Sequence, residues 1–264
     1  MFQDISAVDI RESWNGGFVL FCFIATFLSI TGVTVLSFFV VKREERGEFV
    51  QGAYRSSAAI LGIAFIQNIY GTSGMAPLMI IGTVPLYNAF AVIVLSLLKP
   101  GQRKMDKALL QKTLKGIVTN PIILGIAAGF VWAILKIPQP EILQKTVKNM
   151  AVLATPLGLM AMGASFEGKK ALGKLKPTLI ASALKLVVLA AIFLPIAVWL
   201  GYRESELVAI LVMLGSATTV SSFVMARNMG HEGVLTSSIV MVTTLCSAFT
   251  LTGWLFLLKT LGLV

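Results

Sequence analysis

Apolar runs of about 20 residues recur along the whole chain, and this feature limits the fold more than any other. A run of that length is what a helix needs to cross the hydrocarbon core of a bilayer. The chain has 264 residues, of which 56% are hydrophobic and only 13% are charged, whereas a soluble globular chain carries about 25% charged residues. The composition therefore predicts an integral membrane protein. The length of the chain then indicates how many membrane spans it has, rather than how many soluble domains.

The apolar runs divide the chain into about eight predicted spans. These are 17–41, 54–70, 75–98, 116–135, 147–165, 178–199, 207–226 and 236–258. We expect each of them to be a helix, because a backbone that faces lipid must satisfy its own hydrogen bonds. A barrel would need short strands of alternating polarity, and these runs are continuously apolar. The prediction is an all-α membrane protein.

Basic residues are concentrated in every second loop between the predicted spans. The loops after the first, third, fifth and seventh spans carry Lys42, Arg43, Arg46, Arg55, Lys99, Arg103, Lys104, Lys107, Lys112, Lys115, Lys169, Lys170, Lys174, Lys176 and Arg227. Because positively charged loops stay in the cytoplasm, we predict that these loops are cytoplasmic in the plasma membrane and that both visible termini lie outside. The same distribution explains the net charge of +10 without a nucleic-acid partner.

Side chains that usually carry catalysis or bind metals are sparse. His231 is the only histidine, and Cys22 and Cys246 lie in apolar runs rather than in a spaced metal or redox motif. Every Asp and Glu is predicted to lie in a loop or at the edge of a span, which argues against a carboxylate proton relay inside the membrane. We therefore predict no catalytic residue, no metal site and no cofactor, and an enzyme is disfavoured.

Two of the predicted spans contain clusters of polar side chains. The second contains Ser56, Ser57 and Asn68, and the seventh contains Thr218, Thr219, Ser221 and Ser222. Such groups either line a cavity at the membrane midplane or bond to carbonyls of their own helices in helix packing. For a single hydroxyl the packing explanation is favoured, whereas for the two clusters together we predict a substrate cavity.

Lys185 and Asn88 are predicted to support this cavity. Lys185 lies about two helical turns, or roughly 10 Å, inside the sixth span. An intramembrane lysine is a functional hypothesis by default, as a counter-charge for an anion or in the place of a cation. The alternative is that its long stem lets the ammonium reach the membrane surface. Asn88 follows Pro85 within the third span as a polar contact.

The second and seventh spans are similar to each other. SSAAILGIAFIQNIYG and SATTVSSFVMARNMG both run from small and hydroxyl residues into an apolar stretch, and then reach an asparagine and a glycine. The two segments are five spans apart, so they would cross the membrane in opposite directions. An inverted repeat of this kind is common in secondary transporters. Chance similarity is the alternative, because small residues are frequent in membrane helices.

The end of the chain resembles a known family. SATTVSSFVMARNMG and its continuation HEGVLTSSIVMVTTLCSAFTLTGWLFLL resemble the last two spans of bacterial auxin efflux carrier permeases, and weaker resemblances cover the rest of the chain. The resemblance implies ten helices in two inverted five-helix repeats, similar to bile-acid sodium symporters and sodium/proton antiporters. Residues 1–98 would be the remainder of the first repeat, 99–115 a basic cytoplasmic loop and 116–264 the second repeat. The first two spans of the family would be missing.

The resemblance also implies a substrate site. The second and seventh spans would be broken helices that cross at the site. It would contain Ser57, Asn68, Thr218, Thr219, Ser221 and Ser222, supported by Lys185, Asn88 and Ser56. The family's crossing helices carry prolines where this chain has Ala64 and Ala217, which leaves open whether its helices break.

The function implied by the resemblance is transport of a small organic anion. Family members move dicarboxylates or auxin-like acids by alternating access, often with a proton or sodium gradient as the driving force. The alternative is a truncated member of the same family that does not transport. The lipid bilayer and the anion are the expected partners, and the resemblance leaves a homodimer open.

Overall fold

The computed structural model describes residues 15–72, 74–100, 111, 114–116, 118–119, 121–135 and 140–264. Within these ranges the regular structure is helical, apart from one isolated β-bridge. The polar start of the chain, 1–14, and most of the predicted basic loop, 99–115, lie outside the described residues. The all-α prediction is confirmed for the described part of the chain.

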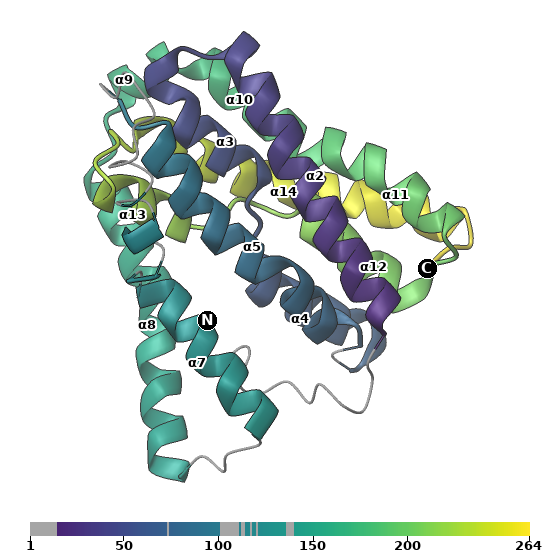
Figure 1. Cartoon of the computed structure of the whole chain (residues 1–264). Helices are drawn as coiled ribbons and strands as arrows, with labels where there is room; N and C mark the ends of the chain where they lie inside the picture. The colour runs from purple at the N-terminus through teal and green to yellow at the C-terminus, as the bar shows by residue number, and fades with distance from the viewer. Residues whose placement is uncertain are drawn as a thin grey trace.

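The helices are labelled in Figure 1. They are α2 (Gly16–Val40), α3 (Arg46–Tyr54), α4 (Ala58–Tyr70), α5 (Ala76–Leu97), α7 (Pro121–Leu135), α8 (Glu141–Ala164), α9 (Gly168–Gly173), α10 (Leu175–Ala183), α11 (Leu189–Trp199), α12 (Glu204–Gly215), α13 (Ser221–Asn228) and α14 (Val234–Thr260). A short 3₁₀ turn, η1 (Arg43–Glu45), precedes α3. A π-helical turn, η2 (Leu184–Val188), joins α10 and α11 into one continuous segment.

Five helical segments of the described chain are long and apolar enough to cross a membrane: 16–40, 76–97, 141–164, 175–199 and 234–260. They coincide with five of the eight predicted spans. At the other three places the helices are shorter: α4 has 13 residues, α7 has 15, and α12 and α13 divide the seventh predicted span between them. The count of eight spans therefore stays a prediction.

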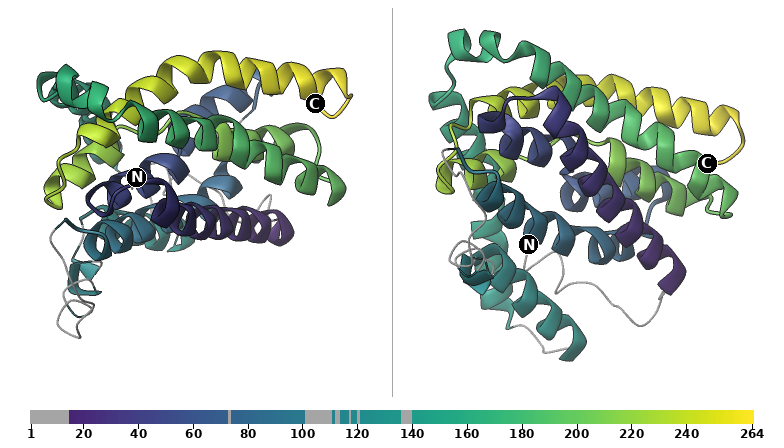
Figure 2. Two further views of the ribbon diagram at one scale, coloured as in Figure 1. Left: turned by 90° about the horizontal axis from the view of Figure 1, so that it is seen from above. Right: turned by 45° about the horizontal axis from the view of Figure 1, so that its top comes forward.

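Two groups of three segments share one order, in which a broken helix lies between two long ones. The first group is α2, α3–α4 and α5, and the second is α10–α11, α12–α13 and α14. Figure 2 shows α2 and α5 on one side of the bundle and α10–α11 with α14 on the other. Helix α3 contacts α2 and α5 as well as α10 and α14, so it lies between the groups. Helices α7 and α8 stand apart from this bundle (Figure 1) and contact it through α5 and α13.

The interior of the bundle is built around α12. All residues of this helix from Leu207 to Gly215 are buried, as expected for a helix that is apolar on every side and packs in a core. Helix α2, by contrast, exposes large apolar side chains such as Phe23, Phe27 and Phe39. A bilayer would cover such an exposed apolar stripe.

Gly82 lets α5 approach α2 closely. A Cβ at Gly82 would lie 2.8 Å from the carbonyl oxygen of Val19 and 3.0 Å from the Cβ of Cys22. We expect Gly82→Ala to push the two helices apart and to lower the free energy of unfolding by about 1–3 kcal/mol, the usual cost of overpacking. The measurement is the Tm of the purified protein in detergent.

Gly32→Ala, in α2, is the matched control, because no atom lies within 4 Å of the added Cβ. Its Tm should be unchanged or higher, since alanine favours a helix over glycine by about 1 kcal/mol. Equal Tm values for the two variants would show that the approach at Gly82 is not close.

Candidate functional site

Two helices of the bundle are interrupted, and the interruptions lie against each other. Residues 55–57 separate α3 from α4, and residues 216–220 separate α12 from α13. Ser56 and Thr218 form an antiparallel β-bridge, so the two chain segments run in opposite directions where they meet. We refer to residues 55–57 and 216–220 together as the crossing.

Hydrogen bonds between distant parts of the chain replace the helical bonds that are lost at the crossing. The backbone N–H of Ser57 donates to the carbonyl of Ala217 over 3.0 Å. The N–H of Thr218 donates to Oγ1 of Thr243 over 3.1 Å, and Oγ1 of Thr218 donates to the carbonyl of Gly52 over 2.7 Å. Freed backbone groups in a buried place need such partners. Both helices therefore break, although neither interruption contains a proline.

The second predicted span begins earlier in the structure than the sequence indicated. Helix α3 starts at Arg46 rather than near residue 54. Arg55, counted above with the basic loop residues although it falls within the predicted second span, is only 1% exposed and lies between α3 and α4. Hydropathy missed this helix because its buried residues include Glu48 and Gln51. The signal that could have identified Arg55 is its place directly before the hydroxyl pair of the second span.

Arg55 is held by uncharged groups. Its Nη2 donates to Oδ1 of Asn88 over 2.6 Å, and its Nη1 contacts Sδ of Met225 at 2.8 Å. The amide nitrogen of Asn88 donates to the carbonyl of Val84 over 2.8 Å, which leaves the amide oxygen for the guanidinium. A thioether is a weak acceptor, so these contacts orient Arg55 without neutralising its charge.

Lys185 lies at the crossing and is fully buried. Its Nζ donates to Oγ of Ser56, to the carbonyl of Leu214 over 2.7 Å and to the carbonyl of Met213 over 3.5 Å. The hydroxyl of Ser56 itself donates to the carbonyl of Met213. The ammonium is thus directed toward the C-terminal end of α12, inside the bundle.

Among the residues that the structure describes, neither cation has an acidic partner. Within the part of the chain that the structure describes, no carboxylate oxygen lies within 4.0 Å of Arg55 or Lys185. Burying a charge without a counter-charge is costly. Two such residues, one in the crossing and one bonded to it, make the crossing a positively charged region inside an apolar bundle.

The remaining predicted site residues differ in position. Thr219 and Ser221 are half-buried, with their hydroxyl oxygens 3.2 Å apart, and Ser57 is half-buried at the start of α4. Ser222 is buried, and its Oγ has no hydrogen-bond partner among the described residues. Asn68 is exposed and lies about 15 Å along α4 from the first residue of that helix. The structure brings the predicted residues together around the crossing, with the exception of Asn68.

Glu48 lies in the first turn of α3, at the edge of the broken helix, and yet is buried. It is part of α3 and is only 2% exposed. Its Oε1 accepts the N–H of Gly233 over 2.9 Å, and its Oε2 accepts the N–H and the hydroxyl of Thr236 over 2.9 and 3.0 Å. These donors belong to the start of α14, so the carboxylate caps that helix, where a negative charge is favourable.

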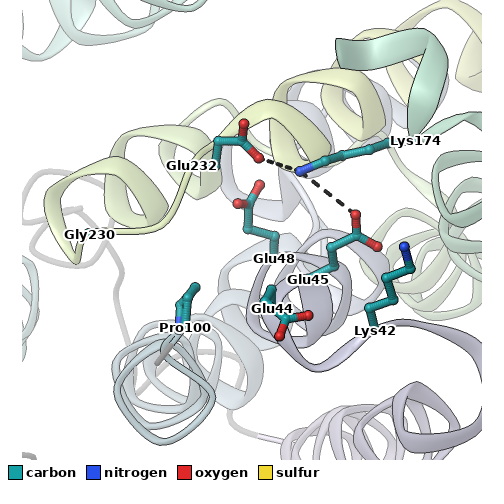
Figure 3. A pocket seen from close by; sticks show the side chains of 8 residues that line it. All are labelled: Lys42, Glu44, Glu45, Glu48, Pro100, Lys174, Gly230 and Glu232. Atoms are coloured by element: carbon teal, nitrogen blue, oxygen red, sulfur yellow. Dashed lines mark hydrogen bonds and ion pairs between the residues drawn. The ribbon is translucent and has the colours of Figure 1, made fainter. Parts of the chain in front are cut away.

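A cavity of about 490 Å³ lies at the end of the bundle where α3 begins (Figure 3). It is lined by Lys42, Glu44, Glu45, Glu48, Pro100, Lys174, Gly230 and Glu232. The Nζ of Lys174 lies 2.5 Å from Oε2 of Glu232 and 3.8 Å from Oε1 of Glu45. The hydrogen bond from Lys174 lowers the pKa of Glu232. These ion pairs join η1, the start of α10 and the loop before α14 at one end of the molecule.

A polar face of α3 connects this cavity with the crossing. Glu48, Gln51 and Arg55 follow one another at spacings of three and four residues, which places them on one side of a helix, and all three are buried. In the amide orientation that satisfies its hydrogen bonds, Gln51 accepts from Nη1 of Arg55 over 3.1 Å and donates to the carbonyl of Ser222 over 3.3 Å. Three buried polar side chains on one side of α3 thus lie between the cavity and the crossing.

Comparison with known proteins gives two similarities over nearly the whole chain. A sequence model of the family described as "Membrane transport protein" matches residues 2–255. A protein of Rhizobium meliloti (strain 1021), named "Putative malonate transporter", is 25% identical over 269 residues, which cover 98% of this chain and 82% of the relative. Both matches include the two segments that form the crossing.

Proposed function

Because the chain belongs to the membrane transport protein family, which is the auxin efflux carrier family that its sequence resembles, we propose that it is a secondary transporter of a small organic anion. Family membership and the name of the relative point to a multi-pass membrane transporter rather than an enzyme. The proposed substrates are dicarboxylates or auxin-like acids. The name of the rhizobial relative, which refers to the dicarboxylate malonate, supports the first of these.

The observation that carries the proposal is the buried guanidinium of Arg55, which lacks a carboxylate partner among the described residues. A substrate carboxylate would supply the missing negative charge, and arginine binds a carboxylate through two parallel hydrogen bonds. Helices α4 and α13 both begin at the crossing, and helix N-termini attract anions. The half-buried hydroxyls of Ser57, Thr219 and Ser221 stand at these N-termini and add further donors.

We propose that transport proceeds by alternating access between two inverted repeats. The shared order of the two three-segment groups supports this proposal, as does the antiparallel direction of the chains at the β-bridge between Ser56 and Thr218. In transporters of this kind, broken helices place the substrate at the interface of the repeats. A proton or sodium gradient is the proposed driving force.

We also propose that the protein lies in the plasma membrane and that the end of the bundle with the cavity faces the cytoplasm. The loops that follow α2, α5, α9 and α13 meet at this cavity, and they include the basic loops that the positive-inside rule assigns to the cytoplasm. At the opposite end Asn15 donates to Glu206, and the N–H of Glu204 donates to the carbonyl of Leu263. The start of α2 and the C-terminus thus lie together on the proposed outer side.

The test of the proposed function is uptake of radiolabelled malonate by liposomes that contain the purified protein. We expect saturable uptake. Unlabelled dicarboxylates should inhibit it, whereas the neutral amides of the same acids should not. Indole-3-acetate, used as a second inhibitor, distinguishes the auxin-like acids from the dicarboxylates. If the folded protein takes up neither class, the non-transporting alternative replaces this proposal.

Thr218→Val tests the contribution of the crossing. Valine keeps the shape of threonine but removes the hydroxyl that donates to Gly52. This bond joins residues 216–220 to α3, so its loss should loosen the crossing. We expect kcat/KM for uptake to fall roughly 5- to 30-fold. This change corresponds to about 1–2 kcal/mol, the contribution of one buried hydrogen bond, if the loosening acts fully on substrate binding.

Thr252→Val is the control, because Thr252 is exposed on α14 and bonds only to its own helix at Ala248. It should transport normally. Asn68→Ala, farther along α4, shows whether the site extends beyond the crossing. If Thr218→Val and Thr252→Val take up substrate equally well, the crossing is not the substrate site.

A further inference from the structure

The ammonium of Lys185 is surrounded by neutral oxygen atoms. Its three acceptors are the hydroxyl of Ser56 and the carbonyls of Met213 and Leu214. Helix α12 ends at Gly215, so carbonyls of its last turn have no partner within the helix. These carbonyls carry the partial negative charge of a helix C-terminus, which favours a cation.

The hydrogen bonds around Lys185 fit a protonated amine better than a neutral one. A carbonyl can only accept, and the single hydrogen of the Ser56 hydroxyl is donated to the carbonyl of Met213. All three groups therefore present an acceptor to Nζ. An ammonium has three hydrogens and satisfies all of them, whereas a neutral amine has two hydrogens and would direct a lone pair at a third acceptor.

We propose that Lys185 is a built-in cation, whose ammonium fills a site for a monovalent cation that Ser56, Met213 and Leu214 form at the crossing. Carbonyl and hydroxyl oxygens are the ligands that replace the hydration shell of such ions, and freed carbonyls at the ends of broken helices are a place where transporters hold them. The wild-type crossing thus carries its positive charge on the chain and takes no free sodium ion at this position.

The charge of Lys185 joins three parts of the bundle. The acceptors around Nζ belong to α12 and to residues 55–57, the break between α3 and α4. Helix α5 is joined to them because the hydroxyl of Tyr87 donates to the carbonyl of Met213 over 2.9 Å. Without a cation, the carbonyl of Leu214 would lose its donor among the described residues, and the carbonyl of Met213 would keep only the hydroxyls of Ser56 and Tyr87. A variant that lacks the ammonium should therefore need a cation from solution to hold the crossing together.

Lys185→Ala provides the test. The variant lacks three carbon atoms and the nitrogen, which together correspond to n-propylammonium. The Tm of purified protein is measured in chloride salts of n-propylammonium, sodium and choline at equal ionic strength. We expect wild-type protein to give one Tm in all three. Lys185→Ala should lose roughly 5 °C or more in choline and regain most of it in n-propylammonium and part of it in sodium.

Three controls make the result specific. Lys259→Ala, at an exposed position of α14, should show no response to these cations. n-Propanol has the shape of the missing group without the charge, and recovery by n-propanol to the same degree would overturn the proposal. Lys185→Met keeps most of the volume of the side chain and should respond to sodium. If neither Lys185 variant gains a response to any cation, the proposal is also overturned.

Folding of the variants is itself a readout. Because the amine can be present while the protein is extracted from membranes, a Lys185→Ala protein that is recovered folded only with n-propylammonium supports the proposal. If choline and n-propylammonium give equal recovery and equal Tm, the proposal fails. All of these measurements report stability, so their outcome is independent of whether the protein transports an anion.

Discussion

Arg55→Ala is expected to abolish measurable anion uptake while leaving the folded protein at least as stable as the wild type. The guanidinium is buried, and its partners among the described residues are Asn88, Gln51 and Met225. Removing a buried cation that lacks a counter-charge relieves an electrostatic cost, so the Tm should stay the same or rise. In the substrate complex the same residue would pair with a carboxylate, and losing such a contact costs about 2–4 kcal/mol. That loss corresponds to a decrease in affinity of roughly 30- to 1,000-fold.

The combination of lost uptake and retained stability separates a binding residue from a structural one. Arg55→Lys should recover only part of the uptake, because lysine cannot form the two parallel bonds of a guanidinium. Arg203→Ala is the control, since Arg203 is at the exposed start of α12 and bonds to the carbonyls of Val198 and Tyr202. An Arg55→Ala protein that transports normally would remove Arg55 from the site, and one with a strongly lowered Tm would give it a structural role.

Glu48→Gln is expected to cause the largest loss of stability. The carboxylate accepts three hydrogen bonds from Gly233 and Thr236 at the start of α14. Glutamine has the same size, but its NH₂ group would face donors, and the negative charge at the helix N-terminus would be gone. Hydrogen bonds to charged groups contribute about 1.5–3 kcal/mol each, so we expect a loss of about 2–4 kcal/mol in total. The Tm in detergent should fall by roughly 5–15 °C.

Glu44→Gln is the control for this prediction. Glu44 lies beside the same cavity but is exposed, so its variant should unfold at the wild-type temperature. A Glu48→Gln protein with unchanged Tm would mean that the cap contributes little to α14. Because α14 also supplies Thr243, which accepts the N–H of Thr218, loss of the cap should also weaken the crossing.

The amino-acid sequence predicted the long helices well and the broken helices only in part. Continuous apolar runs identified the five segments that could cross a membrane, because hydropathy and length suffice for such helices. The hydroxyl clusters that contain Ser56 and Thr218 were also predicted to lie together, and the structure pairs these two residues. The two polar clusters and the similarity of the two segments suggested this pairing, and the family resemblance implied that the two helices cross.

The two interruptions could not be located from local sequence. Three prolines, Pro85, Pro156 and Pro195, lie inside continuous helices, while neither break contains one. The breaks depend instead on long-range partners such as the carbonyl of Ala217 for Ser57. Arg55 was counted with the basic loop as well as in the second span, because the helix before it contains buried polar residues that lower its hydropathy.

The π-helical turn between α10 and α11 divides one long helix into two parts whose faces are rotated relative to each other. At this turn the N–H of Leu189 donates to the carbonyl of Leu184, five residues back instead of four, and the carbonyl of Leu186 is bonded by the indole of Trp254 over 3.1 Å. Each residue turns an α-helix by about 100°, so the extra residue rotates everything after it relative to what came before. The number of residues in the turn 184–188, more than their identity, therefore determines which side of α11 faces the core. A one-residue deletion there would straighten the helix and turn Phe193 away from its buried position.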